Sequence, residues 1–355
     1  MINTVMLSTV MRGAAIAATA LSLTATATLA VAADTVEQFY KGKQINIYIG
    51  TGENAGAVVA YPRAMAEVMG NYIPGNPTFI MRFMPGAGGI KASNFIYSIA
   101  PQDGTVYGFI TRGFILAPIL SDQAQFDPTK FQWIGSTSRE PSVGAVWNAT
   151  TTVRTIQDAM KTETIMGATS MGQDTGIFPS MLNKYAGTKF KIVPGYKSSP
   201  DIELAMERGE VTGKVGWTWG ALNGGRTSTW WPDGKITLLV QLGLTKYNKI
   251  PADVPLAMDL ATSPEGRQVI ELICSPAATG YPSFVGPGVP KDRVDAIRVA
   301  YIKTMSDAKF LAAVKQQNMT VDPMTGDEID KIVKNIYSMP SAAKERAKEL
   351  MPQAF

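Results

Sequence analysis

The chain has 355 residues, with 33 Lys and Arg against 29 Asp and Glu and a formal net charge of +4 at pH 7. This small positive excess, without a Lys/Arg cluster, argues against nucleic-acid binding and is compatible with an anionic small molecule. The absence of histidine excludes a Ser-His-Asp triad, a Cys-His pair and a histidine-ligated metal. The single cysteine, Cys274, excludes an intrachain disulfide. We therefore expect a binding protein, not an enzyme, with no catalytic residue, metal or cofactor.

A secretory signal peptide is predicted at residues 1–32. Arg12 precedes a run of small and apolar residues, and Ala30-Val31-Ala32 has the small-x-small form of a cleavage site. The apolar run is a poor membrane span, and no later segment approaches one. The sequence therefore predicts an exported, soluble mature protein that begins near Ala33.

Strand-like apolar runs alternate with helical patterns along the chain. The first series predicts strands at 45–49, 78–83 and 106–110 and helices at 57–70 and 90–100. After residue 133, a second series predicts strands at 164–168, 190–193, 214–217 and 235–242 and helices at 155–161, 176–186 and 200–208. Three surface helices follow at 291–305, 308–317 and 326–338. Such repetition is typical of the α/β class with mostly parallel sheets, and the length favours two lobes.

A Pro-Gly-Ala-Gly-Gly loop at residues 85–89 joins a predicted strand to a predicted helix. Glycines permit positive φ and leave the backbone amides uncovered, and a helix start adds unpaired N–H groups and partial positive charge. The loop is therefore suited to holding a carboxylate, although an ordinary glycine turn would have the same composition.

Two further loops have the same character. Residues 50–55 formally match the dinucleotide fingerprint G-x-G-x-x-G/A, but Arg82 and Phe83 stand where an acidic residue would bind the ribose. An exported α/β oxidoreductase that binds a nucleotide at this loop is the alternative function. The third loop, 168–175, offers hydroxyl groups that either cap the next helix or bind a carboxylate.

Several of these stretches, in order, resemble the substrate-binding receptors of tripartite tricarboxylate transporters, often called Bug proteins. They are 45–56, 85–89, 100–104 (Ala-Pro-Gln-Asp-Gly), 168–175, 193–198 (Val-Pro-Gly-Tyr-Lys-Ser), 207–211 (Glu-Arg-Gly-Glu-Val), 250–255 (Ile-Pro-Ala-Asp-Val-Pro) and 285–290 (Val-Gly-Pro-Gly-Val-Pro). The resemblance implies a periplasmic-binding-protein type II-like fold with two doubly wound lobes around a ligand cleft. Lobe 1 would comprise residues 33–134 and 244–355, and lobe 2 residues 135–243.

The resemblance also implies a function and a set of contact residues. A monomeric periplasmic receptor would close its cleft on a small organic acid and deliver it to a permease of one large and one small membrane subunit; a receptor for a sensor partner is the alternative. The ligand would contact loops of both lobes through Thr51, Gly52, Glu53, Asn54, Gly56, Arg112, Gly113, Ser136, Thr137, Ser170, Met171, Gly172, Gln173, Thr175, Tyr196, Trp217 and Thr218.

Two features depart from the family pattern. Glu53 and Asn54 interrupt a loop that is usually richer in glycine, and the Glu53 carboxylate would repel a second carboxylate on the ligand or pair with a cationic group. The stretch from Trp217 to Trp231 is rich in tryptophan, which indicates either core packing or an apolar wall for a bulky acid.

Overall fold

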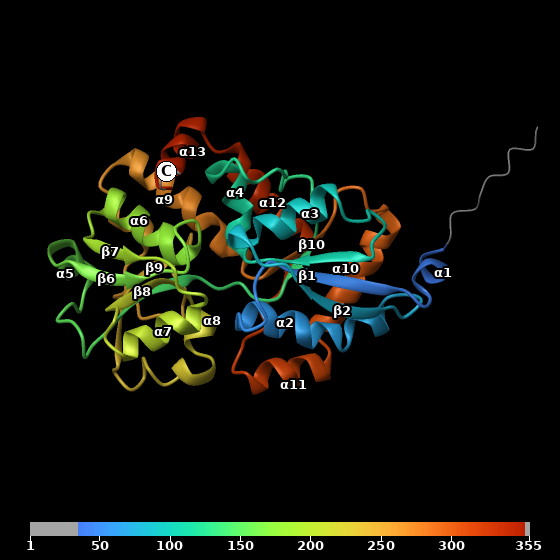
Figure 1. Ribbon diagram of the computed structural model, residues 1–355, viewed down its shortest axis with the longest axis horizontal. Helices are drawn as coiled ribbons and strands as arrows, with labels where there is room; N and C mark the ends of the chain where they lie inside the picture. Colours follow the sequence, from blue (N-terminus) through green and yellow to red (C-terminus); the bar gives the residue numbers. More distant parts are fainter. Residues whose placement is uncertain (1–34, 352–355) are drawn as a thin grey trace, which may run out of the picture. The chain divides into compact units, whose positions relative to one another are not determined.

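Two β-sheets organise the computed structural model, which describes residues 35–351 (Figure 1). The six-stranded sheet has the order β11 (Met324–Thr325), β4 (Gln132–Ser136), β10 (Pro282–Val285), β3 (Val106–Phe109), β1 (Gln44–Ile49) and β2 (Thr78–Phe83). The five-stranded sheet has the order β7 (Phe190–Val193), β6 (Thr164–Gly167), β8 (Gly213–Thr218), β5 (Ser142–Trp147) and β9 (Ile236–Leu242). We call the six-stranded sheet with its helices the first lobe, and the five-stranded sheet with its helices the second lobe.

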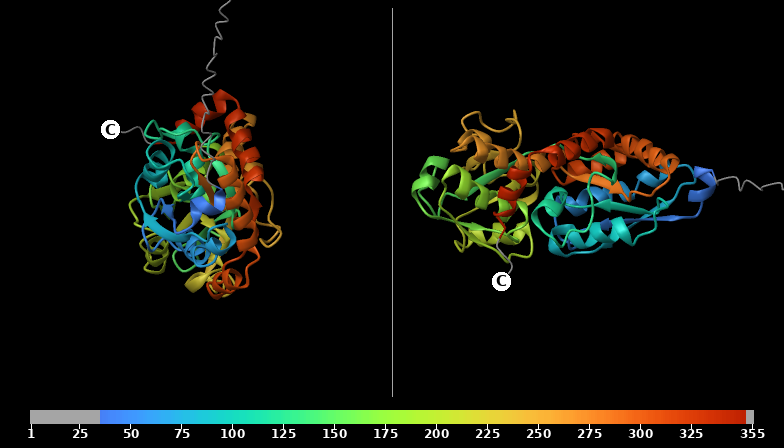
Figure 2. Two further views of the ribbon diagram at one scale, coloured as in Figure 1. Left: turned by 90° about the vertical axis from the view of Figure 1, so that its right-hand side faces the viewer. Right: turned by 90° about the horizontal axis from the view of Figure 1, so that it is seen from above.

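The α-helices connect and cover these strands. They are α1 (Val36–Tyr40), α2 (Ala57–Ala66), α3 (Ile90–Ser98), α4 (Ala117–Leu120), α5 (Ile156–Lys161), α6 (Asp174–Ala186), α7 (Ser199–Glu207), α8 (Trp219–Leu222), α9 (Pro264–Cys274), α10 (Lys291–Met305), α11 (Ala308–Gln316), α12 (Gly326–Ser338) and α13 (Ser341–Lys348). Helices α10 and α12 pack on β4, so the chain's C-terminal part completes the lobe that its N-terminal part begins (Figure 2). Within residues 35–351, no helix is long and apolar enough to cross a membrane.

Each sheet has three parallel strands on one side and antiparallel strands on the other. In the first lobe, β1 pairs in parallel with β2 and β3, whereas β10 runs antiparallel to both β3 and β4. In the second lobe, β6 pairs in parallel with β7 and β8, whereas β5 runs antiparallel to β8 and β9. The prediction of strand-helix-strand units is confirmed for the parallel strands. The prediction of mostly parallel sheets is wrong, because four of the nine strand pairings in the described residues are parallel and five are antiparallel. The antiparallel strands β4, β5 and β10 were not predicted, and their partners come from distant parts of the chain.

Most predicted elements coincide with observed ones. The strands predicted at 78–83 and 190–193 match β2 and β7, and the helices predicted at 291–305 and 326–338 match α10 and α12. Helix α9 was not predicted, although Ser263 caps it by accepting a hydrogen bond from the Gly266 backbone N–H and Pro264 occupies its first turn. The predicted signal peptide lies outside the described residues.

Two crossing segments join the lobes. Residues 137–141 lead from β4 to β5, and residues 275–281 lead from α9 back to β10. Helix α9 packs on α6 of the second lobe and on α13, which in turn packs on α4. An apolar cluster therefore continues from Phe114 and Phe284 in the first lobe to Met181 and Ile270. The lobe boundaries drawn from the sequence stay a prediction.

Candidate functional site

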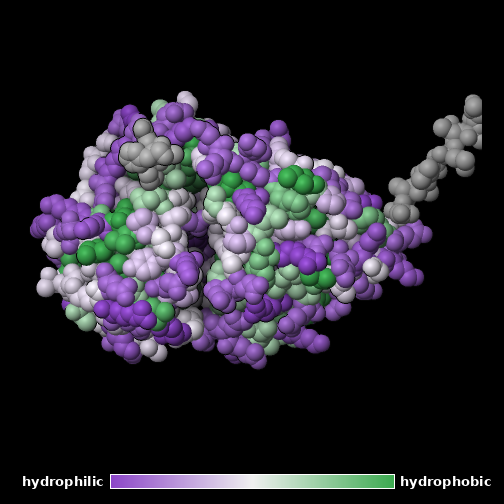
Figure 3. Space-filling view, viewed as in Figure 1, coloured by the Kyte–Doolittle hydropathy of each residue, from purple (hydrophilic) through white to green (hydrophobic). Residues whose placement is uncertain are grey.

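The Pro-Gly-Ala-Gly-Gly loop at residues 85–89 lies directly against the second lobe. A Cβ atom on Gly88, whose φ is +67°, would stand 2.0 Å from Nε2 of Gln173 in the loop before α6. A Cβ on Gly50 would stand 2.8 Å from the Cα of Gly89, so the loop after β1 touches the same segment. The three loops singled out in the sequence therefore adjoin one another. A narrow groove runs between the two halves of the surface in Figure 3.

Three threonine hydroxyl groups at the carboxyl ends of strands in the first sheet are buried and have no hydrogen-bond partner within the described residues. They belong to Thr51, Thr111 and Thr137. Thr51 and Thr111 follow β1 and β3 at equivalent positions, because Ile49 pairs with Phe109 in the parallel register. Thr137 follows β4, which runs in the same direction as β3 because β10 is antiparallel to both. A buried hydroxyl without a partner costs about 1–3 kcal/mol, so these groups are suited to receiving a polar ligand.

Arg112 comes directly after Thr111 and is 4% exposed. Its Nη1 donates to the backbone oxygens of Glu140 (2.8 Å) and Ala277 (3.3 Å), its Nη2 to the hydroxyl of Ser142, and its Nε to Asp174 (3.2 Å). These acceptors lie in both crossing segments, at the start of β5 and at the start of α6. The guanidinium, predicted as a ligand contact, is thus bound to protein groups that join the two lobes.

Asp174 is the first residue of α6, and sequence reasoning did not include it in the site. Its carboxylate occupies the positive end of the helix dipole and pairs with Arg112 at 3.2 Å. Gly216, at φ +86° in β8, allows the sheet to lie close to Asp174. A Cβ atom on Gly216 would stand only 2.7 Å from the Asp174 backbone. An acidic residue at the start of a predicted helix was the available signal. The carboxylate thus ties the start of α6 to the arginine that follows β3.

Glu140, in the first crossing segment, was also missed. The residue is 2% exposed, and its carboxylate accepts hydrogen bonds from the hydroxyls of Ser138 (2.8 Å) and Thr320 (2.5 Å) and from the Gly220 N–H at the start of α8 (2.5 Å). It therefore links the crossing segment to both lobes. No sequence signal identifies it, because its partners lie at distances of up to 180 positions along the chain.

Other predicted hydroxyl contacts are engaged inside the protein. Ser136 Oγ accepts from the Tyr281 N–H at 2.9 Å, and Thr218 Oγ1 lies 3.0 Å from the Tyr281 hydroxyl. Thr175 Oγ1 accepts from the Thr169 N–H at 3.0 Å, so it stabilises the loop before α6. These three side chains shape the surroundings of the groove and have limited capacity for a ligand.

The predicted aromatic contacts belong to the apolar cluster of the second lobe. Trp217 is buried, with its ring centroid 4.1 Å from Lys214 Nζ and 5.8 Å from the Trp230 ring, and Tyr196 packs against the same cluster. Lys214 is itself paired with Glu203 at 2.9 Å. The rings of Trp217 and Trp230 therefore pack in the core of the second lobe, while Nε1 of Trp217 is buried without a hydrogen-bond partner within the described residues.

The remaining predicted residues line the loops with exposed or half-exposed surface. They are Gly52, Glu53, Asn54 and Gly56 after β1, Gly113 after β3, and Ser170, Met171, Gly172 and Gln173 before α6. Among the described residues, no group of three or more acidic or cysteine side chains is arranged to hold a metal ion. The arrangement offers hydroxyls, amides and backbone N–H groups, a set suited to hydrogen bonding with a polar ligand.

Comparison with known proteins defines the fold. No family model and no curated protein matches the sequence. A TctC solute-binding protein from Polaromonas has a TM-score of 0.61 at 16% identity, over 88% of this chain and 98% of that one. The periplasmic binding protein BugD has a TM-score of 0.62 at 18% identity, over 87% and 98%. MatC from Rhodopseudomonas palustris with bound malate has a TM-score of 0.61 at 14% identity, over 86% and 98%.

The chain therefore has the two-lobed α/β fold of periplasmic binding proteins of type II, as the sequence predicted. Its solved structural neighbours include a TctC solute-binding protein and the periplasmic binding protein BugD. At identities of 14–18% these likenesses define the fold alone.

Replacement of Arg112 tests its role in joining the lobes. We expect Arg112→Ala to lower the free energy of unfolding by about 3 kcal/mol, because it leaves the Asp174 carboxylate and buried carbonyl groups without their donor. Urea denaturation followed by tryptophan fluorescence measures the change. Arg139→Ala is the matched control, since Arg139 forms an exposed pair with Asp322 and its loss should cost no more than about 1 kcal/mol. Equal losses in the two variants would contradict the role assigned to Arg112.

The thiol of Cys274 reports on opening of the same region. Burial raises its pKa to about 12, with a further upward contribution from the Asp174 carboxylate and a downward one from Arg112. Because the thiolate is the reactive form, we expect Ellman's reagent to leave the native protein unmodified at mildly alkaline pH and to modify it rapidly in denaturant. Arg112→Ala should accelerate the native reaction, because loss of the hydrogen bonds between the lobes exposes the thiol more often, and this outweighs the rise in pKa that removal of the guanidinium causes. Rapid modification of the native wild-type protein would contradict the buried position.

Proposed function

We propose that this protein is an exported solute-binding receptor of the tripartite tricarboxylate transporter type. In the periplasm it captures a small organic acid between its lobes and delivers it to a permease of one large and one small membrane subunit. The observation that carries the proposal is the meeting of loops from both lobes beside three buried, unpartnered hydroxyl groups. The likeness to TctC and Bug structures over nearly their full length supports it.

The ligand carboxylate accepts hydrogen bonds from neutral donors in this proposal. Thr51, Thr111 and Thr137 supply hydroxyls at the carboxyl ends of strands in the first sheet, and the loops at 50–56 and 86–88 supply backbone N–H groups. Hydrogen bonds to a charged acceptor contribute about 1.5–3 kcal/mol each, so such a set is sufficient for affinity without a free cation. Arg112 does not contact the ligand in this proposal; it holds the start of α6 against the first lobe.

Closure follows from the distribution of these groups over the two lobes. A ligand that contacts the first-lobe threonines and the loop at 168–173 together has more contacts in the closed state than in the open one, and it shifts the equilibrium toward closure. The crossing segments 137–141 and 275–281 are the positions at which the backbone would turn.

The charges near the groove favour an acid with one carboxylate. Arg112 is the only cationic side chain in the predicted contact set, and Asp174 pairs with it. Glu53, in the exposed loop after β1, adds a negative charge. Two of the structural neighbours were solved with the dicarboxylates adipate and malate. We propose that this receptor prefers a monocarboxylate, or an acid whose second group is neutral or cationic.

A panel of acids tests the function directly. Mono-, di- and tricarboxylates, aromatic acids and amino acids are added to the purified protein, and thermal unfolding is recorded. A true ligand at 100 times its dissociation constant stabilises by about 2.7 kcal/mol, which gives a clear rise in Tm. Nicotinamide cofactors are tested in the same way. The proposal is contradicted if they raise Tm and no acid in the panel raises it.

The double variant Thr51→Val, Thr111→Val tests the site. We expect binding of the acid selected by the panel to weaken by at least about tenfold, or ~1.4 kcal/mol, because two donors are lost. The unliganded protein should keep its stability, since neither hydroxyl has a protein partner. Isothermal titration calorimetry measures the affinity, with Thr150→Val, at an exposed position, as the control. Unchanged affinity in the double variant would place the ligand elsewhere.

Glu53→Gln tests the charge preference. The substitution removes one negative charge from an exposed loop and keeps its size, so we expect dicarboxylates to gain affinity relative to monocarboxylates. The ratio of the two dissociation constants, measured at low ionic strength, is the readout, and Glu163→Gln, at an exposed position in the second lobe, is the control. A ratio that does not change, or that falls in favour of monocarboxylates, would contradict the proposed role of Glu53.

A further inference from the structure

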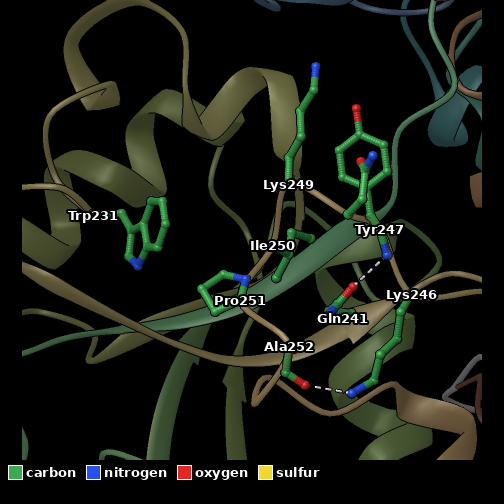
Figure 4. Close-up of a pocket in the computed structure, with 9 residues that line it drawn as sticks. Trp231, Gln241, Lys246, Tyr247, Lys249, Ile250, Pro251 and Ala252 are labelled. Atoms are coloured by element: carbon green, nitrogen blue, oxygen red, sulfur yellow. Dashed lines mark hydrogen bonds between the residues drawn. The ribbon is translucent and has the colours of Figure 1, made fainter.

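A concavity of about 480 Å³ lies on the second lobe and is separate from the proposed carboxylate site (Figure 4). Its wall is built from Trp231, from Gln241 in β9 and from the loop at residues 246–252. None of the residues predicted to contact the carboxylate lines it. We call it the Trp231 pocket. Its volume lies within the range of small-molecule sites, about 300–1,000 Å³.

The pocket wall is held in place by internal hydrogen bonds. Gln241 is fully buried, and its side chain accepts from the Tyr247 N–H and donates to the Val254 oxygen, both at 3.0 Å. Lys246 Nζ donates to the Ala252 oxygen at 2.7 Å, which closes the loop upon itself. The loop is therefore tied at both ends to β9 and to itself, so its shape exists before any ligand arrives.

The surfaces of the pocket are flat and largely apolar. The Trp231 indole forms one side and faces Pro251, while Tyr247 stands on the other side and Ile250 lies between them (Figure 4). The Trp231 ring is fixed by an edge contact with Trp219, with centroids 5.7 Å apart. Two aromatic walls around an aliphatic base accommodate a planar apolar group.

The charges of the pocket have one sign. Lys246 and Lys249 line it, and no carboxylate does. Lys246 uses one of its donors on Ala252, and Lys249 Nζ lies 5.9 Å from the centroid of the Tyr247 ring. Figure 4 shows the two side chains extending in different directions from the loop, so ammonium groups flank the apolar walls. An anionic group on a planar ligand would find a positive partner at either end.

We propose that the Trp231 pocket is a second binding site, which takes a planar apolar anion such as an aromatic monocarboxylate. Its walls select the ring and its lysines select the negative charge. The site is independent of the carboxylate site beside Thr51 and Thr111, since the two share no residue. It stands whether or not the proposed transport function does.

Calorimetry with 2-naphthoate, and with the neutral 2-naphthalenemethanol, tests the proposal on the full mature chain. We expect 2-naphthoate to bind and the alcohol to bind at least about fivefold more weakly, because it lacks the charge. Lys249→Glu and Trp231→Leu should each weaken 2-naphthoate by at least about fivefold. Lys191→Glu is the matched control, since Lys191 is an exposed lysine on β7, at the opposite edge of the same sheet.

The variants separate this site from the carboxylate site. Thr51→Val, Thr111→Val should leave 2-naphthoate binding unchanged, while it weakens the acid found by the thermal panel. The proposal is overturned if the threonine variant abolishes 2-naphthoate binding, if Lys249→Glu behaves as Lys191→Glu, or if the alcohol binds as tightly as the anion. Binding of an acidic peptide without binding of 2-naphthoate would also overturn it and would identify a protein-docking surface.

Discussion

The buried guanidinium of Arg112 is the interaction on which the relation of the two lobes depends. A cation in the interior is tolerated only when its donors are satisfied, and here the acceptors come from both crossing segments, from β5 and from α6. A single side chain thereby sets where the α6 start lies relative to the strand ends of the first lobe. Glu140 supports the same region with three hydrogen bonds of its own.

This constraint leaves a particular chemistry for the groove. With Arg112 committed to Asp174, hydroxyls and backbone N–H groups remain as donors, and in the proposed function they bind the carboxylate by directed hydrogen bonds instead of by a salt bridge. Such donors depend on geometry, and the Gly88–Gln173 contact and the shared apolar cluster provide that geometry from both lobes. The Trp231 pocket differs in its chemistry, because lysine ammonium groups lie beside its aromatic side chains.

Local patterns accounted for much of the fold and for part of the site. Strands β2 and β7 and helices α10 and α12 follow from short-range periodicity, which is why their predicted ends coincide with the observed ones. Thr51 entered the predicted contact set with the loop after its strand, and the same rule applies to Thr111. The antiparallel strand β10 pairs with β3 and β4, which lie far away in sequence, so no local pattern specified its partners.

The sequence by itself determined the α/β class, the absence of histidine chemistry and the positions of the glycine loops, because each of these depends on composition or on neighbouring residues. Only the tertiary structure decided which polar groups are left for a ligand. Arg112 and Thr51 both follow a strand in the sequence, yet burial gave the guanidinium four protein acceptors and left the hydroxyl without one. Hydrogen-bond satisfaction depends on residues that meet only when the chain folds, and it is this balance that separates a binding group from a structural one.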